Sequence, residues 1–515
     1  MKEQLEMLWS LFYAHLSLSL VALFIGTAIS IPLGIWVSHR KKWRKIVLGF
    51  SGVIQTIPGL ALLAIMVPLL DFTSRFFAHY LNFKFSSIGY LPALLALILY
   101  SLLPILRNTV TGILGVDREL IEAAEAVGMT PRQRLFKVEL IMALPVIFAG
   151  LRTATIWVIG LTTLATPVGA PSLGNLIFSG LQTKNYPAVF GGCIAAAILA
   201  IFFDSLMGKI ESSWRKRQFG LLKTIIVFLT LLYGVIFFNS LKELFTDNDN
   251  KVIIGTKSFT EQYILGDILK KMIQEKTSME VDLRKSLGSN LLFDALKNDQ
   301  IDIYISYSGT VWSSLMKRKD IPSSSEELLS EVRSFIEKEH NAKVASFLGF
   351  ENKYAFAMAR SKAEKLSIKK VSDLKNHSLR LKLGTDYVFL DRLEWKNIKK
   401  LYTIDFRKKI VMDPTLMYDS VNKGEVDVIT AYTSDGRIKK YGLIILEDDL
   451  KAIPPYHTLA LLSPRALEKK PFLYKILQRL ENKISLSTMQ KLNYLVDEEG
   501  KTTKEAADIF LKELE

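Results

Sequence analysis

Long apolar stretches in the first half of the chain are the feature that most limits how it can fold. A helix needs about 20 apolar residues to cross the roughly 30 Å apolar core of a bilayer. Six stretches come close to or exceed this length, over residues 11–37, 46–70, 89–105, 141–161, 188–207 and 221–239. We therefore predict an all-α polytopic membrane domain over residues 1–220, followed by a sixth transmembrane helix and linker over 221–250.

Lys and Arg gather in alternate loops of this half. Five fall in each of the segments 39–45, 107–137 and 209–223, whereas the N-terminus and the intervening loops hold four in total. Because Lys and Arg in short loops stay on the cytoplasmic side, the alternation predicts an external N-terminus. An even number of spans then places the C-terminal half outside as well, so we expect a multi-pass protein of the cell membrane with an external C-terminal domain.

Several functional classes are excluded by what the sequence lacks. The net charge is +15, but no Lys/Arg run is interleaved with aromatic residues, which argues against nucleic-acid binding. A single cysteine, Cys193, excludes an intrachain disulfide. The six histidines show no metal-ligand spacing, and no nucleophile and base pattern stands out. We expect no catalytic residue, no metal and no cofactor.

The loop between the third and fourth predicted spans has its own helical signals. Residues 118–127 are good helix formers, Gly128 can end a helix with positive φ, and Thr130 followed by Pro131 can start another. Two short helices joined at a glycine would form a compact knob on the cytoplasmic side. From periodicity alone, a solvated charged loop is the more favoured interpretation.

The residues of this loop resemble the EAA loop of ABC importer permeases. Glu122, Ala123, Ala124 and Gly128 carry the resemblance, and the run over residues 55–63, QTIPGLALL, is similar to the osmoprotectant subfamily. The resemblance implies a type I importer permease that works as a homodimer, and a docking helix that inserts into a separate ATPase subunit. The chain has no G-x-x-x-x-G-K-[ST] phosphate loop, so ATP hydrolysis is expected from that partner.

From residue 251 the composition becomes that of a soluble α/β protein. We predict strands over residues 252–255, 281–286, 301–306, 342–348, 354–359, 379–383, 426–431 and 443–446. Ser258 and Glu261 have the spacing of a capping box that starts a helix. Helices between most strands indicate a mostly parallel sheet. The length favours two lobes, one over about 251–358 and 455–515, the other over about 359–454.

Tyrosines stand at sharp turns or strand ends of this domain. Tyr307, Tyr354 and Tyr432 are each placed in this way. A single tyrosine is more often a packing residue, but three in such positions favour aromatic faces turned to a ligand. Cages of aromatic faces hold quaternary ammonium groups, which cannot donate hydrogen bonds, through cation–π attraction.

The C-terminal half resembles the type II periplasmic-binding fold of the glycine betaine, choline and carnitine binding proteins. The resemblance rests on motifs such as FTEQY at 259–263 and YSGT at 307–310. It implies that the ligand is lined by Gln262, Tyr307, Thr310, Tyr354 and Tyr432, with Asp435 bracing its turn. The chain departs from the family pattern at Ile305 and Ser306, and it has no tyrosine between Tyr307 and Tyr354. The cage is therefore expected to be either incomplete or completed elsewhere, with Tyr387 and Phe389 as candidates.

Taken together, these features predict the membrane subunit of an ATP-driven ABC importer that carries its own receptor for a quaternary-ammonium solute. Fused importers of this layout include those for ergothioneine, and the sequence does not choose among betaine, choline, carnitine and ergothioneine. The alternative is a ligand-sensing membrane receptor or gated channel. Against that alternative, the sequence shows no cytoplasmic output domain, and its longest internal segment is the docking-like loop.

Overall fold

The computed structural model describes most of residues 2–514, and the chain divides into two compact units. The residues outside the description are 82–84, 184, 217, 219, 221–222, 225–226, 228–229, 237, 239–250, 323 and 387. One unit is helical and comprises Met1–Gly180 and Tyr186–Asp247. The other comprises Leu181–Asn185 and Asn248–Glu515 and contains both β-sheets.

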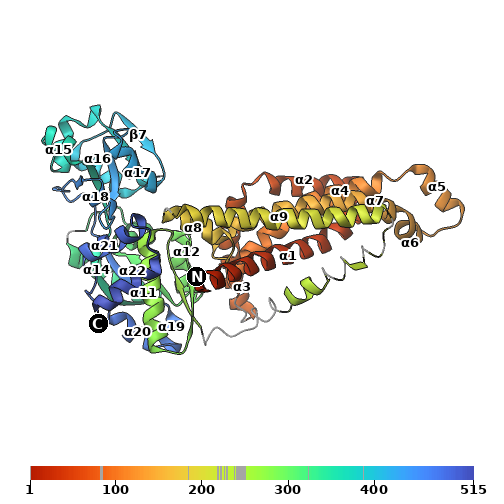
Figure 1. Cartoon of the computed structure of the whole chain (residues 1–515), viewed down its shortest axis with the longest axis horizontal. Coiled ribbons are helices and arrows are strands. Elements are labelled where there is room, and N and C mark those ends of the chain that lie inside the picture. Colours follow the sequence, from red (N-terminus) through yellow and green to blue (C-terminus); the bar gives the residue numbers. More distant parts are fainter. Residues whose placement is uncertain are drawn as a thin grey trace. The chain divides into compact units, whose positions relative to one another are not determined.

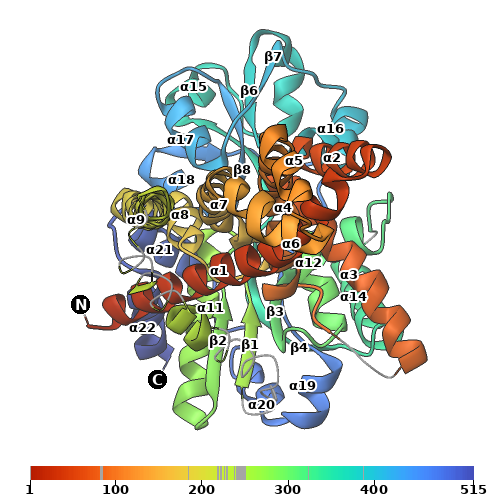
Figure 2. The same cartoon turned by 90° about the vertical axis from the view of Figure 1, so that its right-hand side faces the viewer.

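The helical unit is a bundle of long apolar helices (Figure 1). Its main elements are α1 (Lys2–Ser38), α2 (Lys41–Thr56), α3 (Gly59–Leu81), α4 (Tyr90–Leu114), α7 (Leu140–Thr162) and α9 (Tyr186–Arg215). Helix α4 packs against both α1 and α7, and α7 packs against α9. Two short helices, α5 (Arg118–Ala126) and α6 (Pro131–Arg134), lie at one end of the bundle, nearest the viewer in Figure 2.

Five described helices are long and apolar enough to cross a membrane, against the six that we predicted. The sixth prediction, over 221–239, is interrupted by residues outside the description, and the described residues among them are helical. The second, over 46–70, was wrong in its bounds, because the qualifying span is Gly59–Phe77. The helix breaks at Ile57, whose extended backbone (φ −71°, ψ 127°) is the conformation that a following proline favours.

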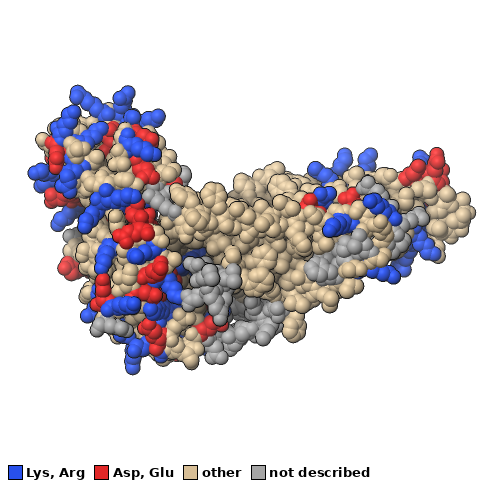
Figure 3. Space-filling view, in the orientation of Figure 1, with Lys and Arg blue, Asp and Glu red and all other residues tan. Residues whose placement is uncertain are grey.

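Charged side chains are sparse along the middle of this bundle. The space-filling view shows a broad uncharged surface over the long helices, with Lys and Arg toward the end that carries α5 and α6 (Figure 3). Arg152 of α7 and Asp204 of α9 pair with each other, one contact being Nη2 to Oδ2 at 2.7 Å. The two charges therefore bridge a helix interface.

The second unit contains two five-stranded sheets, each combining parallel and antiparallel pairs. The first has the order β2-β1-β3-β10-β4, from Glu280–Arg284, Lys251–Gly255, Ile303–Tyr307, His457–Leu462 and Lys343–Glu351. The second has the order β7-β6-β8-β5-β9, from Lys408–Val411, Lys382–Thr385, Val428–Tyr432, Tyr354–Ala359 and Leu443–Ile445. In each sheet four strands run in one direction, and a single strand, β10 in the first and β5 in the second, runs against them.

Helices cover these sheets and complete a two-lobed α/β fold. They are α11 (Thr260–Lys276), α12 (Ser289–Lys297), α13 (Ser308–Thr310), α14 (Ser325–Ser334), α15 (Arg360–Lys365), α16 (Leu393–Tyr402), α17 (Pro414–Asn422), α18 (Arg437–Lys440), α19 (Pro464–Lys469), α20 (Phe472–Gln478), α21 (Leu486–Asp497) and α22 (Thr503–Leu514). The first sheet shares a buried core with α11, α20, α21 and α22. The second has separate cores on its two faces.

The two-lobed α/β prediction is confirmed, with differences in detail. Each sheet has four strands in one direction and one strand against them, and two strands, β7 and β10, were not predicted at all. The first lobe was predicted to extend to residue 358, yet β5 pairs with β8 and β9 in the second sheet. The chain therefore passes from the first sheet to the second at residues 352–353, a few residues earlier than expected. The remaining domain bounds stay predictions.

Candidate functional site

Two of the predicted ligand residues, Tyr354 and Tyr432, form a direct cross-strand pair. Tyr354 is the first residue of β5 and Tyr432 is the last of β8, and the antiparallel register sets them opposite each other. Their ring centroids are 4.8 Å apart with an interplanar angle of 40°. Directly opposed residues on one face of an antiparallel pair lie within contact distance, so the register itself brings these two rings together.

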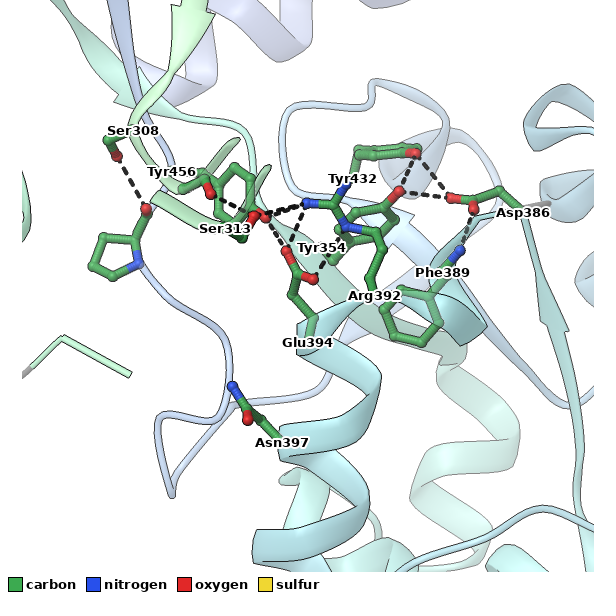
Figure 4. Close-up of polar contacts among 12 residues, drawn as sticks. Ser308, Ser313, Tyr354, Asp386, Phe389, Arg392, Glu394, Asn397, Tyr432 and Tyr456 are labelled. Carbon is green, nitrogen blue, oxygen red and sulfur yellow. Dashed lines mark hydrogen bonds and ion pairs between the residues drawn. The ribbon is translucent and has the colours of Figure 1, made fainter. Parts of the chain in front are cut away.

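The hydroxyl groups of this pair converge on one carboxylate, that of Asp386. Each phenolic oxygen lies 2.9 Å from Oδ2, and both tyrosines donate to it (Figure 4). The other carboxylate oxygen accepts from the backbone N–H groups of Val388 and Phe389, at 2.9 and 2.8 Å. Asp386 follows β6 and is 4% exposed. Burial, reinforced by the charge of Asp386, raises the pKa of Tyr354, so its hydroxyl stays a donor.

Phe389 lies against the same pair, as one of the two candidates for completing the cage. Its ring centroid is 5.1 Å from that of Tyr354, and its side chain is buried. The other candidate, Tyr387, lies outside the described residues.

Tyr307, at the end of β3, belongs to the same buried apolar cluster as Tyr354, with Tyr432 packed against it. Its hydroxyl donates to the carboxylate of Glu261 at 2.5 Å and accepts from the amide of Gln262 at 2.9 Å. Phe259 stacks on its ring with centroids 6.3 Å apart. The lobes thus meet at a set of aromatic rings drawn from β3, β5 and β8.

The capping box predicted at Ser258 and Glu261 was wrong. Helix α11 has Phe259 as its N-cap and no side-chain capping bond. Glu261 instead accepts from Tyr307 and from the amide of Asn352, at 3.1 Å. Burial raises the pKa of this carboxyl despite those hydrogen bonds. A residue that the local pattern assigned to helix capping is therefore used where the lobes meet.

The chain's own cations lie over two of the tyrosine rings. The ammonium of Lys257 is 4.8 Å from the ring centroid of Tyr307, and the guanidinium carbon of Arg392 is 5.4 Å from that of Tyr354. Lys257 is 5% exposed. Burial, and then the nearby charge of Arg392, lower its pKa to about 7, against the opposing effect of Glu261.

Arg392 connects both lobes through its polar contacts, as Figure 4 shows. Its guanidinium binds both carboxylate oxygens of Glu394, at 3.1 and 2.8 Å. It also donates to the hydroxyl of Tyr456 at 2.8 Å and to that of Ser313 at 3.4 Å. Ser313 and Tyr456 belong to the segments after β3 and before β10, whereas Arg392 follows β6. Sequence reasoning missed Lys257, Asp386 and Arg392, and no motif signal marked them.

The other predicted ligand residues lie at different distances from the ring cluster. Gln262 is buried and bonded to Tyr307, and Thr310 is partly buried in α13, three residues along the chain from Tyr307. Asp435 is bound to Arg437 instead, accepting from its backbone N–H at 2.9 Å and from its guanidinium at 2.8 Å. That pairing lies within the turn after β8, and the part that Asp435 plays at the ligand stays a prediction.

The docking-like loop folds as its local signals predicted. Asp117 caps α5 by accepting from the backbone of Glu119 at 3.1 Å. Gly128 has φ +79°, a conformation that disfavours other residues. Thr130 and Gln133 form a capping box that starts α6, with Pro131 in its first turn.

Arg134 ties this loop to the start of α7. It pairs with Glu125 of α5 and with Glu139, the latter at 2.8 Å. Glu139 is 3% exposed and lies 3.3 Å from the ring of His39, in the turn after α1. Arg134 and Glu139 therefore connect α5 to the start of α7 and to the turn after α1.

The surface of the loop mixes charge with exposed apolar groups. Glu122 and Ala123 are exposed, whereas Ala124 is buried. Val127 is 73% exposed and Phe136 is 65% exposed. Exposed apolar residues beside charged ones are typical of protein contact surfaces.

Family models match both units of the chain. Residues 250–513 match the substrate-binding domain of ABC-type glycine betaine transport systems. Residues 30–216 match the binding-protein-dependent transport system inner membrane component.

Curated relatives share the same two parts. The chain is 29% identical over 509 residues to the ergothioneine transport permease/ergothioneine binding protein EgtU of Helicobacter pylori, covering 95% of this chain and 87% of that protein. It is 41% identical over 199 residues to the choline transport system permease protein OpuBB of Bacillus subtilis, covering 39% and 84%. It is 32% identical over 277 residues to the carnitine transport binding protein OpuCC of Listeria monocytogenes, covering 53% and 90%.

Proposed function

Because the chain belongs to the family of substrate-binding domains of ABC-type glycine betaine transport systems, joined here to a binding-protein-dependent permease, we propose that it imports a betaine-type solute. The matched families are transport proteins and not enzymes. The predicted membrane-embedded permease with a fused solute-binding domain is thereby confirmed. The solute itself, the partners and the orientation are parts of our proposal.

One observation carries the choice of a cationic ligand: Tyr307, Tyr354 and Tyr432 come together from three strands, and two of their rings already face a cation. Lys257 and Arg392 occupy those faces at 4.8 and 5.4 Å. A trimethylammonium group would exploit the same attraction, which contributes about 0.5 to 2 kcal/mol per ring.

The relatives' names point to solutes of this chemistry, namely ergothioneine, choline and carnitine. Gln262 and Thr310 stay our candidates for orienting the polar end of the ligand. Arg392, and Lys257 when it is protonated, place positive charge beside the rings, which favours a ligand that carries a carboxylate opposite its ammonium group.

Calorimetry on the purified chain in lipid nanodiscs tests this proposal. The panel contains glycine betaine, choline, carnitine and ergothioneine. We expect at least one of them to bind, with the carboxylate-bearing members ahead of choline. Absence of binding by all four would refute the proposed ligand class.

We also propose that a homodimer forms the pathway and that a separate ATPase docks on α5 and the Gly128 turn. Ligand would close the two lobes of an external binding domain, and the ATPase would move α7 and α1 through Arg134 and Glu139. Rigid-body closure of this kind is a common way to couple binding to transport. The exposed Glu122, Ala123 and Val127 would supply part of the docking surface, with the buried Ala124 permitting close packing.

Affinity purification and protease treatment test these partners and this orientation. The tagged chain should recover an ATPase and a second copy of itself, whereas a ligand sensor would recover no ATPase. Protease added to intact cells should cleave within residues 251–515. Labelling of Ala123→Cys, in a chain that also carries Cys193→Ala, should require permeabilised cells. Protection of the C-terminal domain in intact cells would contradict the external orientation.

A further inference from the structure

Asp386 is a buried carboxylate whose charge no basic side chain balances within the described part of the chain. It is 4% exposed, and its four hydrogen bonds come from two tyrosine hydroxyls and two backbone N–H groups. Buried charges in proteins are normally paired, because an isolated ion loses its hydration. The structure of this chain follows that rule elsewhere.

Three other buried carboxylates of the same domain each pair with a cation. Asp302 pairs with Lys470 at 2.9 Å, Glu394 pairs with Arg392 at 2.8 Å, and Asp435 pairs with Arg437. Glu261 differs, since burial raises its pKa and Lys257 lies nearby. Asp386 has hydrogen bonds to neutral donors only, and it lies at the hydroxyl ends of the Tyr354 and Tyr432 rings.

We propose that Asp386 supplies the negative charge that makes this site select a cation, acting through the two tyrosine hydroxyls rather than by touching the ligand. This inference rests on the proposed function and names the residue that sets its specificity. A phenol that donates to a carboxylate carries more electron density on its ring, so its face attracts a cation more strongly. The carboxylate also acts directly on a cation held over the rings, at low local dielectric.

In this arrangement Asp386 attracts the cationic ligand without touching it, and the tyrosine rings make the contact. The charge stays hydrogen-bonded at the hydroxyl ends of the two rings, where it does not touch a cation held over their faces (Figure 4). Asp386 is thus a positioning residue for the two tyrosines and the electrostatic partner of the ligand. A ligand of the same shape without the charge should gain little from it.

A pair of isosteric ligands provides the test. Glycine betaine and 3,3-dimethylbutyrate have the same shape, but a carbon atom replaces the ammonium nitrogen in the second. We expect D386N to weaken glycine betaine binding by the chain in nanodiscs about tenfold or more, and to change 3,3-dimethylbutyrate binding less than about twofold. The conservative variant D386E, which keeps the charge, should stay within about threefold of the wild-type affinity for glycine betaine.

The outcomes separate this inference from the proposed function. Equal losses for both ligands in D386N, or no loss for glycine betaine, would overturn it. Where 3,3-dimethylbutyrate binds too weakly to measure, the comparison of D386N with D386E decides: equal affinities refute the role of charge. If the wild-type chain binds none of the four quaternary-ammonium compounds, the proposed function itself fails. Thermal melting of each variant confirms that it is folded.

Discussion

The docking loop and the tyrosine cluster are built in opposite ways. The loop, defined by residues 117–139, is continuous in sequence, and its caps, glycine turn and ion pairs are mostly local. The tyrosine cluster, defined by Tyr307, Tyr354 and Tyr432 with Asp386 at the hydroxyl ends of the last two, draws on three strands and the segment after a fourth. The loop is exposed and depends on backbone shape, whereas the cluster is buried and depends on charge and ring placement.

This difference predicts how each region fails. A change in the loop should affect coupling to a partner and leave ligand affinity intact. A change in the cluster should affect ligand affinity and leave docking intact. The following variants test this separation, in order of decreasing effect.

Replacement of Gly128 should have the largest effect. Gly128 has φ +79° and open space around its Cβ position, so Gly128→Val acts through the backbone alone. Valine is strongly disfavoured in this conformation, by about 1 to 3 kcal/mol, and the turn should shift. We expect uptake by cells to fall to background with unchanged ligand affinity. Gly424→Val, at φ +74° and equally open but in the binding domain, is the matched control and should transport. Loss of ligand binding in Gly128→Val would contradict the prediction that the loop affects docking and not ligand affinity.

Truncation of Tyr432 should have the next largest effect. Tyr432→Ala removes one ring face and one donor to Asp386. We expect the Kd of the trimethylammonium ligand to rise about tenfold or more, since roughly 1.4 kcal/mol corresponds to a factor of ten. Calorimetry measures this, with Tyr474→Ala in α20 as a control outside the cluster. ATPase recovery should be unchanged, and an unaltered Kd would refute the cage.

Replacement of Lys257 should have the smallest effect, on stability. Its folded-state pKa of about 7 lies below the ordinary 10.5, so the buried charge destabilises the fold. The cost is fully present below pH 7 and fades as pH rises toward 10.5, where both states become neutral. We expect ligand-free Lys257→Met to raise the Tm of the binding domain at pH 7 by a few degrees, at about 2 to 4 °C per kcal/mol.

The pH dependence of this gain is the decisive observation. The increase in Tm should shrink at pH 9, because wild-type Lys257 is then already neutral when folded. Lys400→Met, at an exposed position of α16, is the control and should change Tm little at either pH. A gain independent of pH would mean that packing, not charge, explains the effect.

Local signals were sufficient wherever neighbouring residues supply the contacts. Gly128, Thr130 and Pro131 act within one or two turns, so their pattern predicted the helices correctly. The same reasoning failed at Glu261, because the capping pattern competes there with Tyr307 and Asn352, which are far away in sequence. It also missed β10, which pairs antiparallel between β3 and β4 at the end of a long excursion of the chain.

The sequence by itself determined that most of the first half is apolar helix, that the second half is a two-lobed α/β domain, and that tyrosines stand at its strand ends. Those properties follow from composition, periodicity and turn residues, which are local. Only the tertiary structure decided that Tyr354 and Tyr432 face each other, that Asp386 accepts from both hydroxyls, and that Lys257 and Arg392 lie over the rings. Strand register and the meeting of the lobes set these distances, and neither is encoded by neighbouring residues.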